Sequence, residues 1–92
     1  MTNIRHFKIE VQGRVQGVWF RKYTKEAADS FGVCGYVCNR ADGSVYLEAE
    51  GEEEQLQKLL TWLEKGSPLS RVTRVLWDAG DMRHYASFEV RR

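Results

Sequence analysis

Apolar and polar residues alternate near the start of the chain, over residues 4–12. One side of this segment carries Phe7, Ile9 and Val11. A period of two predicts a strand with one buried face. The alternation stops in a glycine-containing loop expected over 13–17, and helical spacing of apolar residues follows from Phe20 to Phe31. Gly32 stands where a helix C-terminal glycine belongs, so we expect the first helix to end there.

The rest of the pattern predicts a second helix and four more strands. The helix is expected to begin at the acidic run from Glu52, which suits the positive end of a helix dipole, and to end at Gly66. The strands are expected over 34–39, 44–50, 71–77 and 85–91. This order predicts an α+β fold, a ferredoxin-like βαββαβ sandwich with an extra C-terminal strand. We expect an antiparallel sheet with both helices on one face and polar positions on the open face, as a single domain over residues 1–92.

Charge narrows the classes of partner. The chain of 92 residues has a formal net charge of +1, which argues against a nucleic-acid or membrane-surface binder. Residues 1–40 hold 7 basic and 3 acidic side chains, so this part carries +4 and suits a small anion. No apolar run is long enough for a membrane span and no signal-peptide core is present, so we expect a cytoplasmic protein. If Cys34 and Cys38 lie on one strand, four residues apart, their Cα atoms are roughly 13 Å apart, which is too far for a disulfide.

The segment from Gly13 to Arg21 carries the first candidate chemistry. Glycines at both ends of a short loop let backbone N–H groups turn inward, and the following helix adds its own unpaired N–H groups. Such a concavity holds a phosphate-sized anion, and Arg21 can add a bidentate contact to two phosphate oxygens. The alternative is an ordinary glycine-containing turn with a surface arginine, in which Trp19 and Phe20 anchor the helix. The residues alone leave both interpretations open.

Asn39 is the second candidate, near the end of a predicted strand where a hairpin begins. Its amide can both donate and accept hydrogen bonds, so it can orient a water molecule. Taken alone, the position favours a different role, an Asx turn that stabilises the hairpin.

Together, these two segments resemble the signatures of the acylphosphatase family. Val11 to Arg21 matches the first signature without a mismatch, and Gly35 to Gly51 matches the second except at Cys38, where the family usually carries a basic residue. The tail also fits, with Gly66-Ser67-Pro68 before Arg71-Val72 and Phe88-Glu89-Val90 near the end. The resemblance therefore covers nearly the whole chain.

The resemblance implies hydrolysis of acyl phosphates to a carboxylate and inorganic phosphate. It implies that Arg21 and the loop backbone hold the phosphate, that Asn39 positions the attacking water, and that no metal or organic cofactor takes part. The loop residues are Val15, Gln16, Gly17, Val18, Trp19 and Phe20. The chemistry agrees, because a carboxylate leaves without a general acid and donors around the phosphoryl oxygens stabilise the transition state.

Two further classes remain as alternatives. RNA-binding modules share the βαββαβ layout, but the predicted open face offers one tyrosine and three glutamates, a poor stacking platform for a polyanion. The second alternative is a phosphate-binding regulator without turnover. Cys38 stands beside Asn39 in place of a basic side chain, a change that weakens attraction for the acyl portion or for phosphate. We expect acyl phosphate and inorganic phosphate as partners, no nucleic acid or membrane, and a monomer. His6 and His84 are predicted to be surface residues, and no zinc-type cluster is present in the sequence.

Overall fold

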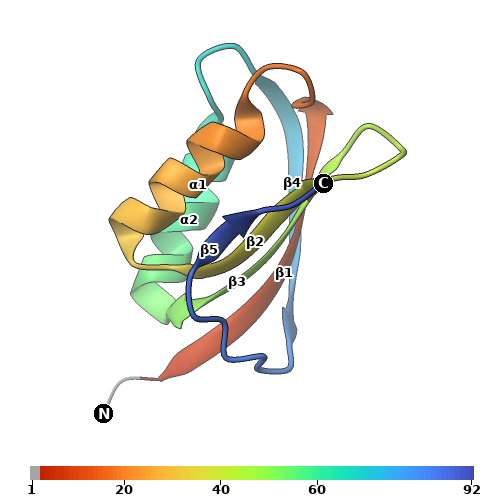
Figure 1. Cartoon of the computed structure of the whole chain (residues 1–92). Coiled ribbons are helices and arrows are strands. Elements are labelled where there is room, and N and C mark those ends of the chain that lie inside the picture. Colours follow the sequence, from red (N-terminus) through yellow and green to blue (C-terminus); the bar gives the residue numbers. More distant parts are fainter. Residues whose placement is uncertain (1–2) are drawn as a thin grey trace.

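A five-stranded sheet carries two helices on one face (Figure 1). The structure is a computed structural model that describes residues 3–92, so the first two residues of the predicted domain lie outside the described part. In chain order the elements are β1 (Ile4–Arg14), α1 (Phe20–Phe31), β2 (Cys34–Asn39), β3 (Val45–Glu52), α2 (Glu53–Lys65), β4 (Arg71–Gly80) and β5 (Phe88–Val90). The predicted ferredoxin-like α+β arrangement is confirmed.

The sheet has the order β4-β1-β3-β2-β5, with β3 at its centre. The first four strands pair antiparallel, as predicted. The last strand differs, because β5 pairs with β2 in parallel and makes the sheet mixed. The reason is topological: β4 lies at one edge, and the chain reverses direction while it crosses to the other edge. The chain therefore enters β5 in the direction of β2.

The core lies between the sheet and the helices. Phe7, Ile9 and Val11 of β1 are almost completely buried, as the alternation predicted. The leucine stripe of α2 faces them, with Leu56 and Leu59 fully buried. Each such side chain contributes about 1.5–3 kcal/mol relative to an exposed one. None of the helices within residues 3–92 is long and apolar enough to cross a membrane.

The boundaries of β1, β4 and β5 differ from the predicted ones, and β4 runs to Gly80 rather than ending at residue 77. β1 continues to Arg14 through a register shift between Gln12 and Gly13, so the connecting loop is 15–19 rather than 13–17. Gly13 has a φ of 129°, and a Cβ there would clash with the carbonyl oxygen of Arg71 on β4. Only glycine therefore permits this close strand approach. At the other end of the chain, the last strand is shorter than predicted.

The prediction that His6 is a surface residue is wrong. It lies on the open sheet face, as the alternation indicates, but it is only 2% exposed. Its Nε2 lies 2.8 Å from Glu48 Oε1 and its Nδ1 lies 2.6 Å from Glu50 Oε2. The ring of Tyr85 stacks on it at 5.9 Å between centroids. The cause is tertiary: the segment between β4 and β5 folds back over this part of the open face.

Candidate active site

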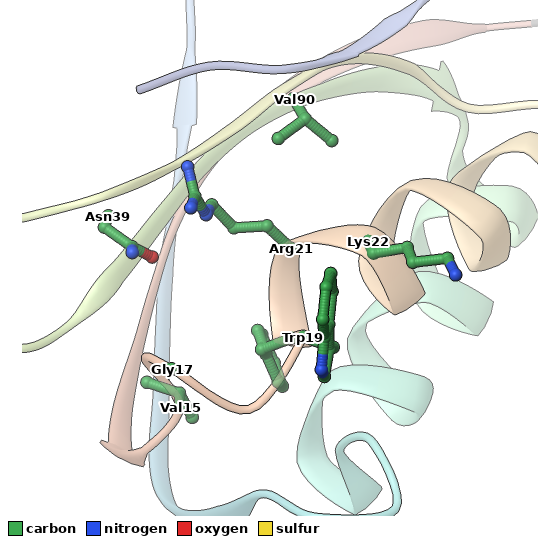
Figure 2. Close-up of a pocket in the computed structure, with 8 residues that line it drawn as sticks. Val15, Gly17, Trp19, Arg21, Lys22, Asn39 and Val90 are labelled. Atoms are coloured by element: carbon green, nitrogen blue, oxygen red, sulfur yellow. The ribbon is translucent and has the colours of Figure 1, made fainter.

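One cavity of about 410 Å³ opens where the β1–α1 loop, the end of β2 and β5 come together (Figure 2). Pockets of roughly 300–1,000 Å³ hold whole small molecules. The lining residues are Val15, Gly17, Trp19, Phe20, Arg21, Lys22, Asn39 and Val90. The fold thus brings together Arg21 and Asn39, the two residues singled out by the sequence, from segments far apart along the chain.

The 15–19 loop presents backbone donors to this cavity. Gly17 and Trp19 both adopt left-handed φ angles, 74° and 62°. The N–H groups from Gln16 to Phe20 have no hydrogen-bond acceptor within residues 3–92. Trp19 is the N-cap of α1 and its side chain makes no capping hydrogen bond, so the first-turn N–H groups are not capped by it. Left-handed residues within a turn and an uncapped helix start are the geometry of backbone anion sites.

Trp19 and Phe20 have opposite roles. Phe20 is 1% exposed and packs in the core as a helix anchor, whereas Trp19 is 69% exposed. Trp19 also has a left-handed φ, which costs a residue with a Cβ about 1–3 kcal/mol. Lys22 Nζ lies 5.8 Å from the centroid of the Trp19 ring, within the range of a cation–π contact. The interpretation of Trp19 as a core anchor is therefore wrong.

Arg21 lies in the first turn of α1 and is half-buried. Its Nη1 donates a hydrogen bond of 3.0 Å to the backbone carbonyl of Arg91, just beyond β5. In Figure 2 the guanidinium extends toward the side of the cavity where Asn39 lies, away from Lys22. The carbonyl fixes one donor, and the other N–H groups of the planar fork remain for an anion.

Asn39 is the last residue of β2. Its side-chain Oδ1 is buried and has no hydrogen-bond donor among the described residues. The Asx turn of this hairpin is made instead by Asp42, whose Oδ1 accepts from the Ser44 N–H at 2.9 Å and from the Ser44 hydroxyl at 2.6 Å. Buried polar atoms are normally paired, so an unpaired acceptor beside a cavity points to a ligand or water contact.

Gln16 and Val18 do not line the cavity with their side chains. Gln16 Nε2 donates to the carbonyls of Arg40 at 2.7 Å and of Ser44 at 2.8 Å, which ties the loop to the hairpin that follows Asn39. Val18 is 7% exposed and belongs to the core. For both residues only the backbone N–H group remains as a candidate contact.

Lys22 and Val90 are the lining residues that the sequence analysis missed. Lys22 directly follows Arg21, so its position next to the loop could have identified it as a lining residue. Val90 had no such signal, because its place depends on β5 pairing with β2. Cys38, the position that departs from the family pattern, is half-buried and is not among the lining residues.

Fold and cavity together define a class: a ferredoxin-like α+β sandwich in which unpaired backbone donors, an arginine and an amide surround one pocket. A model of the acylphosphatase family matches residues 7–90, and the chain belongs to this family. It is 42% identical to an acylphosphatase of Thermotoga maritima over 96% of this chain and 98% of that relative. It is 45% identical to one of Archaeoglobus fulgidus, over 90% and 93%. The crystal structure of the Bacillus subtilis acylphosphatase superposes with a TM-score of 0.93 at 35% identity, over 98% of this chain and 100% of that one.

Proposed function

We propose that this chain hydrolyses acyl phosphates, the mixed anhydrides of a carboxylic acid and phosphoric acid, to a carboxylate and inorganic phosphate. The observation that carries the proposal is the unpaired Oδ1 of Asn39 in the cavity that Arg21 and the unpaired loop N–H groups also line. Family membership and the named relatives support the same reaction.

The phosphoryl group is held by the backbone N–H groups of residues 15–20 and by Arg21. Negative charge on the equatorial phosphoryl oxygens rises toward the transition state, and donors held in advance stabilise it without reorganisation. The Arg91 carbonyl contributes by holding one guanidinium N–H, which leaves the rest of the fork directed at the phosphoryl oxygens. Removal of one such donor typically costs about 10²–10³ in rate.

Asn39 positions the attacking water. Its Oδ1 accepts one hydrogen of the water, and the water oxygen then forms a bond to phosphorus on the side opposite the acyl oxygen. The bond between phosphorus and the acyl oxygen breaks, and its electron pair leaves with the carboxylate. The second proton of the water passes to a phosphoryl oxygen. No protein base is needed, because the amide only orients the water.

The direct test is hydrolysis of acetyl phosphate and benzoyl phosphate by the purified chain in the presence of EDTA. The proposal predicts turnover without added metal, since the donors around the phosphoryl group come from the protein alone. It also predicts competitive inhibition by inorganic phosphate, which has the same oxygens as the transferred group. If both acyl phosphates disappear at the uncatalysed rate, the proposed function is wrong.

We propose a monomeric, cytoplasmic protein that forms one domain over residues 1–92 and does not bind nucleic acid. The net charge of +1 supports the absence of nucleic-acid binding, because such binding draws on a basic excess. The open face carries three tyrosines, Tyr36, Tyr46 and Tyr85, rather than the one predicted from the sequence. All three hydroxyls donate to Glu48. A carboxylate at the centre of this face disfavours a polyanion. A salt-dependent shift with single-stranded RNA would contradict this part.

A further inference from the structure

Glu50 on β3 is a buried carboxylate on the open face, remote from the cavity lining. It is 4% exposed, a costly position for a charge unless hydrogen bonds compensate. Its Oε2 accepts from His6 Nδ1 at 2.6 Å and from the Arg83 N–H at 2.6 Å. Its Oε1 accepts from the Tyr85 N–H at 3.0 Å. Burial alone would raise the pKa of Glu50, but these hydrogen bonds lower it by more than burial raises it. The pKa therefore lies below its ordinary value, and the group is ionised.

Two of these donors belong to the segment 81–87, which joins β4 to β5 without regular secondary structure and crosses the bottom of the view in Figure 1. Between Arg83 and Tyr85 stands His84, exposed as predicted, with a left-handed φ of 59°. A left-handed residue that turns its neighbours' N–H groups toward one anion is a backbone nest. The strain of this conformation at His84 persists only where the surroundings require it. The Glu50 carboxylate supplies that requirement.

The nest lies three residues before the C-terminal strand, β5. β5 is three residues long and lies at the edge of the sheet, so β2 alone gives it few backbone hydrogen bonds. The Gly35 N–H donates to the Ser87 carbonyl at 3.0 Å, and the Arg91 N–H donates to the Val37 carbonyl at 2.8 Å. The carbonyl of that same Arg91 accepts the hydrogen bond from Arg21. A shift of β5 therefore moves the acceptor that orients Arg21.

We infer that Glu50 is a positioning residue for the reaction: by closing the 83–85 nest it fixes β5, and through the Arg91 carbonyl it orients the Arg21 guanidinium. The inference rests on the proposed function, because it assumes that Arg21 holds the phosphoryl group. His6 completes the arrangement. Its Nδ1 contacts the Glu50 carboxylate and its Nε2 contacts the Glu48 carboxylate, so the buried ring holds Glu50 beside the nest.

Glu50→Gln tests the inference with almost no change in volume. A glutamine has one acceptor oxygen, so its amide nitrogen must face a donor that the carboxylate now satisfies. We expect kcat/KM for benzoyl phosphate to fall about 10-fold and the inhibition constant of inorganic phosphate to rise, because small misplacements of a binding group cost roughly 10–10²-fold. Glu10→Gln is the matched control: Glu10 lies on the same face and contacts Gln12 and Arg40 but not the nest. It should keep wild-type kinetics.

A double-mutant cycle separates positioning from general destabilisation. If Glu50 acts through Arg21, then Glu50→Gln has no further effect on the residual rate in an Arg21→Ala background. If the two losses multiply, Glu50 acts independently and the inference is wrong.

Substitutions of His84 test the role of the 83–85 nest in a second way, without changing Glu50. His84→Gly adopts the left-handed φ without strain and should keep wild-type kinetics. His84→Val resists that conformation, so it should open the nest and raise the phosphate inhibition constant as Glu50→Gln does. Equal kinetics for the glycine and valine variants would overturn the inference. If the wild-type protein hydrolyses acyl phosphates and Glu50→Gln has the same kinetics, the inference is wrong but the proposed function stands. If the wild-type protein shows no turnover, the proposed function is wrong.

Discussion

Arg21 has its guanidinium held by a backbone carbonyl on a different element, and this contact explains why the residue type matters. A planar fork can donate to the Arg91 carbonyl and to two phosphoryl oxygens together. An ammonium group is a single point charge on a flexible stem and cannot reproduce that geometry.

Arg21→Lys should therefore lower kcat/KM for acyl phosphates by about 10²-fold or more, although the charge is retained. Steady-state kinetics with benzoyl phosphate measure the effect. Arg71→Lys, an exposed arginine on β4 outside the cavity, is the matched control and should be unaffected. A lysine variant that keeps more than about half of the wild-type rate would show that charge alone suffices.

At this scale, the sequence predicted residues whose environment is local. Arg21 and the loop glycines lie within one short segment, and Asn39 lies within another. The family signatures therefore singled out both residues, and both line the cavity. His6 was misjudged because its burial depends on Tyr85 and on Glu50, which lie far along the chain. Alternation gives the face of a strand, but it does not show what covers that face.

The β1–α1 loop and the 40–44 hairpin are two elements joined by one side chain. Gln16 makes two hydrogen bonds across them, to the Arg40 and Ser44 carbonyls. Gln16→Ala should reduce kcat/KM by about 10-fold, because the loop donors and Asn39 lose their fixed relative position. The free energy of unfolding should fall by only about 1 kcal/mol, since one of the two hydrogen bonds is exposed. A loss of stability without a loss of kcat/KM would argue against a positioning role.

Gly35 sets how closely β2 packs against β3. It has a φ of 144°, and a Cβ there would clash with the Glu48 carbonyl oxygen. Gly35→Ala should therefore destabilise the protein by more than about 2 kcal/mol, measured by urea unfolding. Gly43 is the matched control, with a φ of 95° and open space around it. Its alanine variant should lose about 1–2 kcal/mol from strain alone. Equal losses at both positions would show that the close strand approach does not matter.

Element positions followed from the sequence more reliably than element ends. The helix stripes and the strand alternation are local patterns, and the Asp42-Gly43 turn fixed the hairpin. The continuation of β1 to Arg14 depends on pairing with β4, and the parallel partner of β5 depends on where the chain crosses the sheet. Neither interaction leaves a local pattern in the sequence.

Across the whole molecule, the open face carries a carboxylate cluster that links stability to pH. Burial alone would raise the pKa of Glu48, but hydrogen bonds from Tyr36, Tyr46 and His6 lower it by more. The net shift of the pKa is downward. Glu50 shifts in the same direction. Burial and the Glu48 contact raise the pKa of Tyr46 from 10.0 to about 12. The native state therefore favours ionised carboxylates and neutral tyrosines.

The free energy of unfolding should be highest at pH values between the carboxyl and tyrosine pKa values. It should fall at lower and at higher pH. A lowered carboxyl pKa gives stability that is complete above its unfolded value, near 4.5, and lost as pH falls through the folded value. A raised tyrosine pKa gives stability that is complete below 10.0 and lost as pH rises toward about 12. Urea unfolding across pH measures both limbs. Glu48→Gln should flatten them, and unchanged slopes in that variant would contradict the assignment.

Arg21 and Asn39 have separate tasks in this site: Arg21 binds the phosphoryl group and Asn39 positions the water. One kinetic measurement distinguishes the two. Benzoyl phosphate hydrolysis and phosphate inhibition are measured with EDTA for the wild-type protein and for Asn39→Ala. We predict that kcat of the variant falls by about 10²-fold while the inhibition constant of inorganic phosphate stays within about twofold, because only the water loses its acceptor. An unchanged kcat in Asn39→Ala, or a loss of phosphate affinity as large as the loss of kcat, would contradict the account.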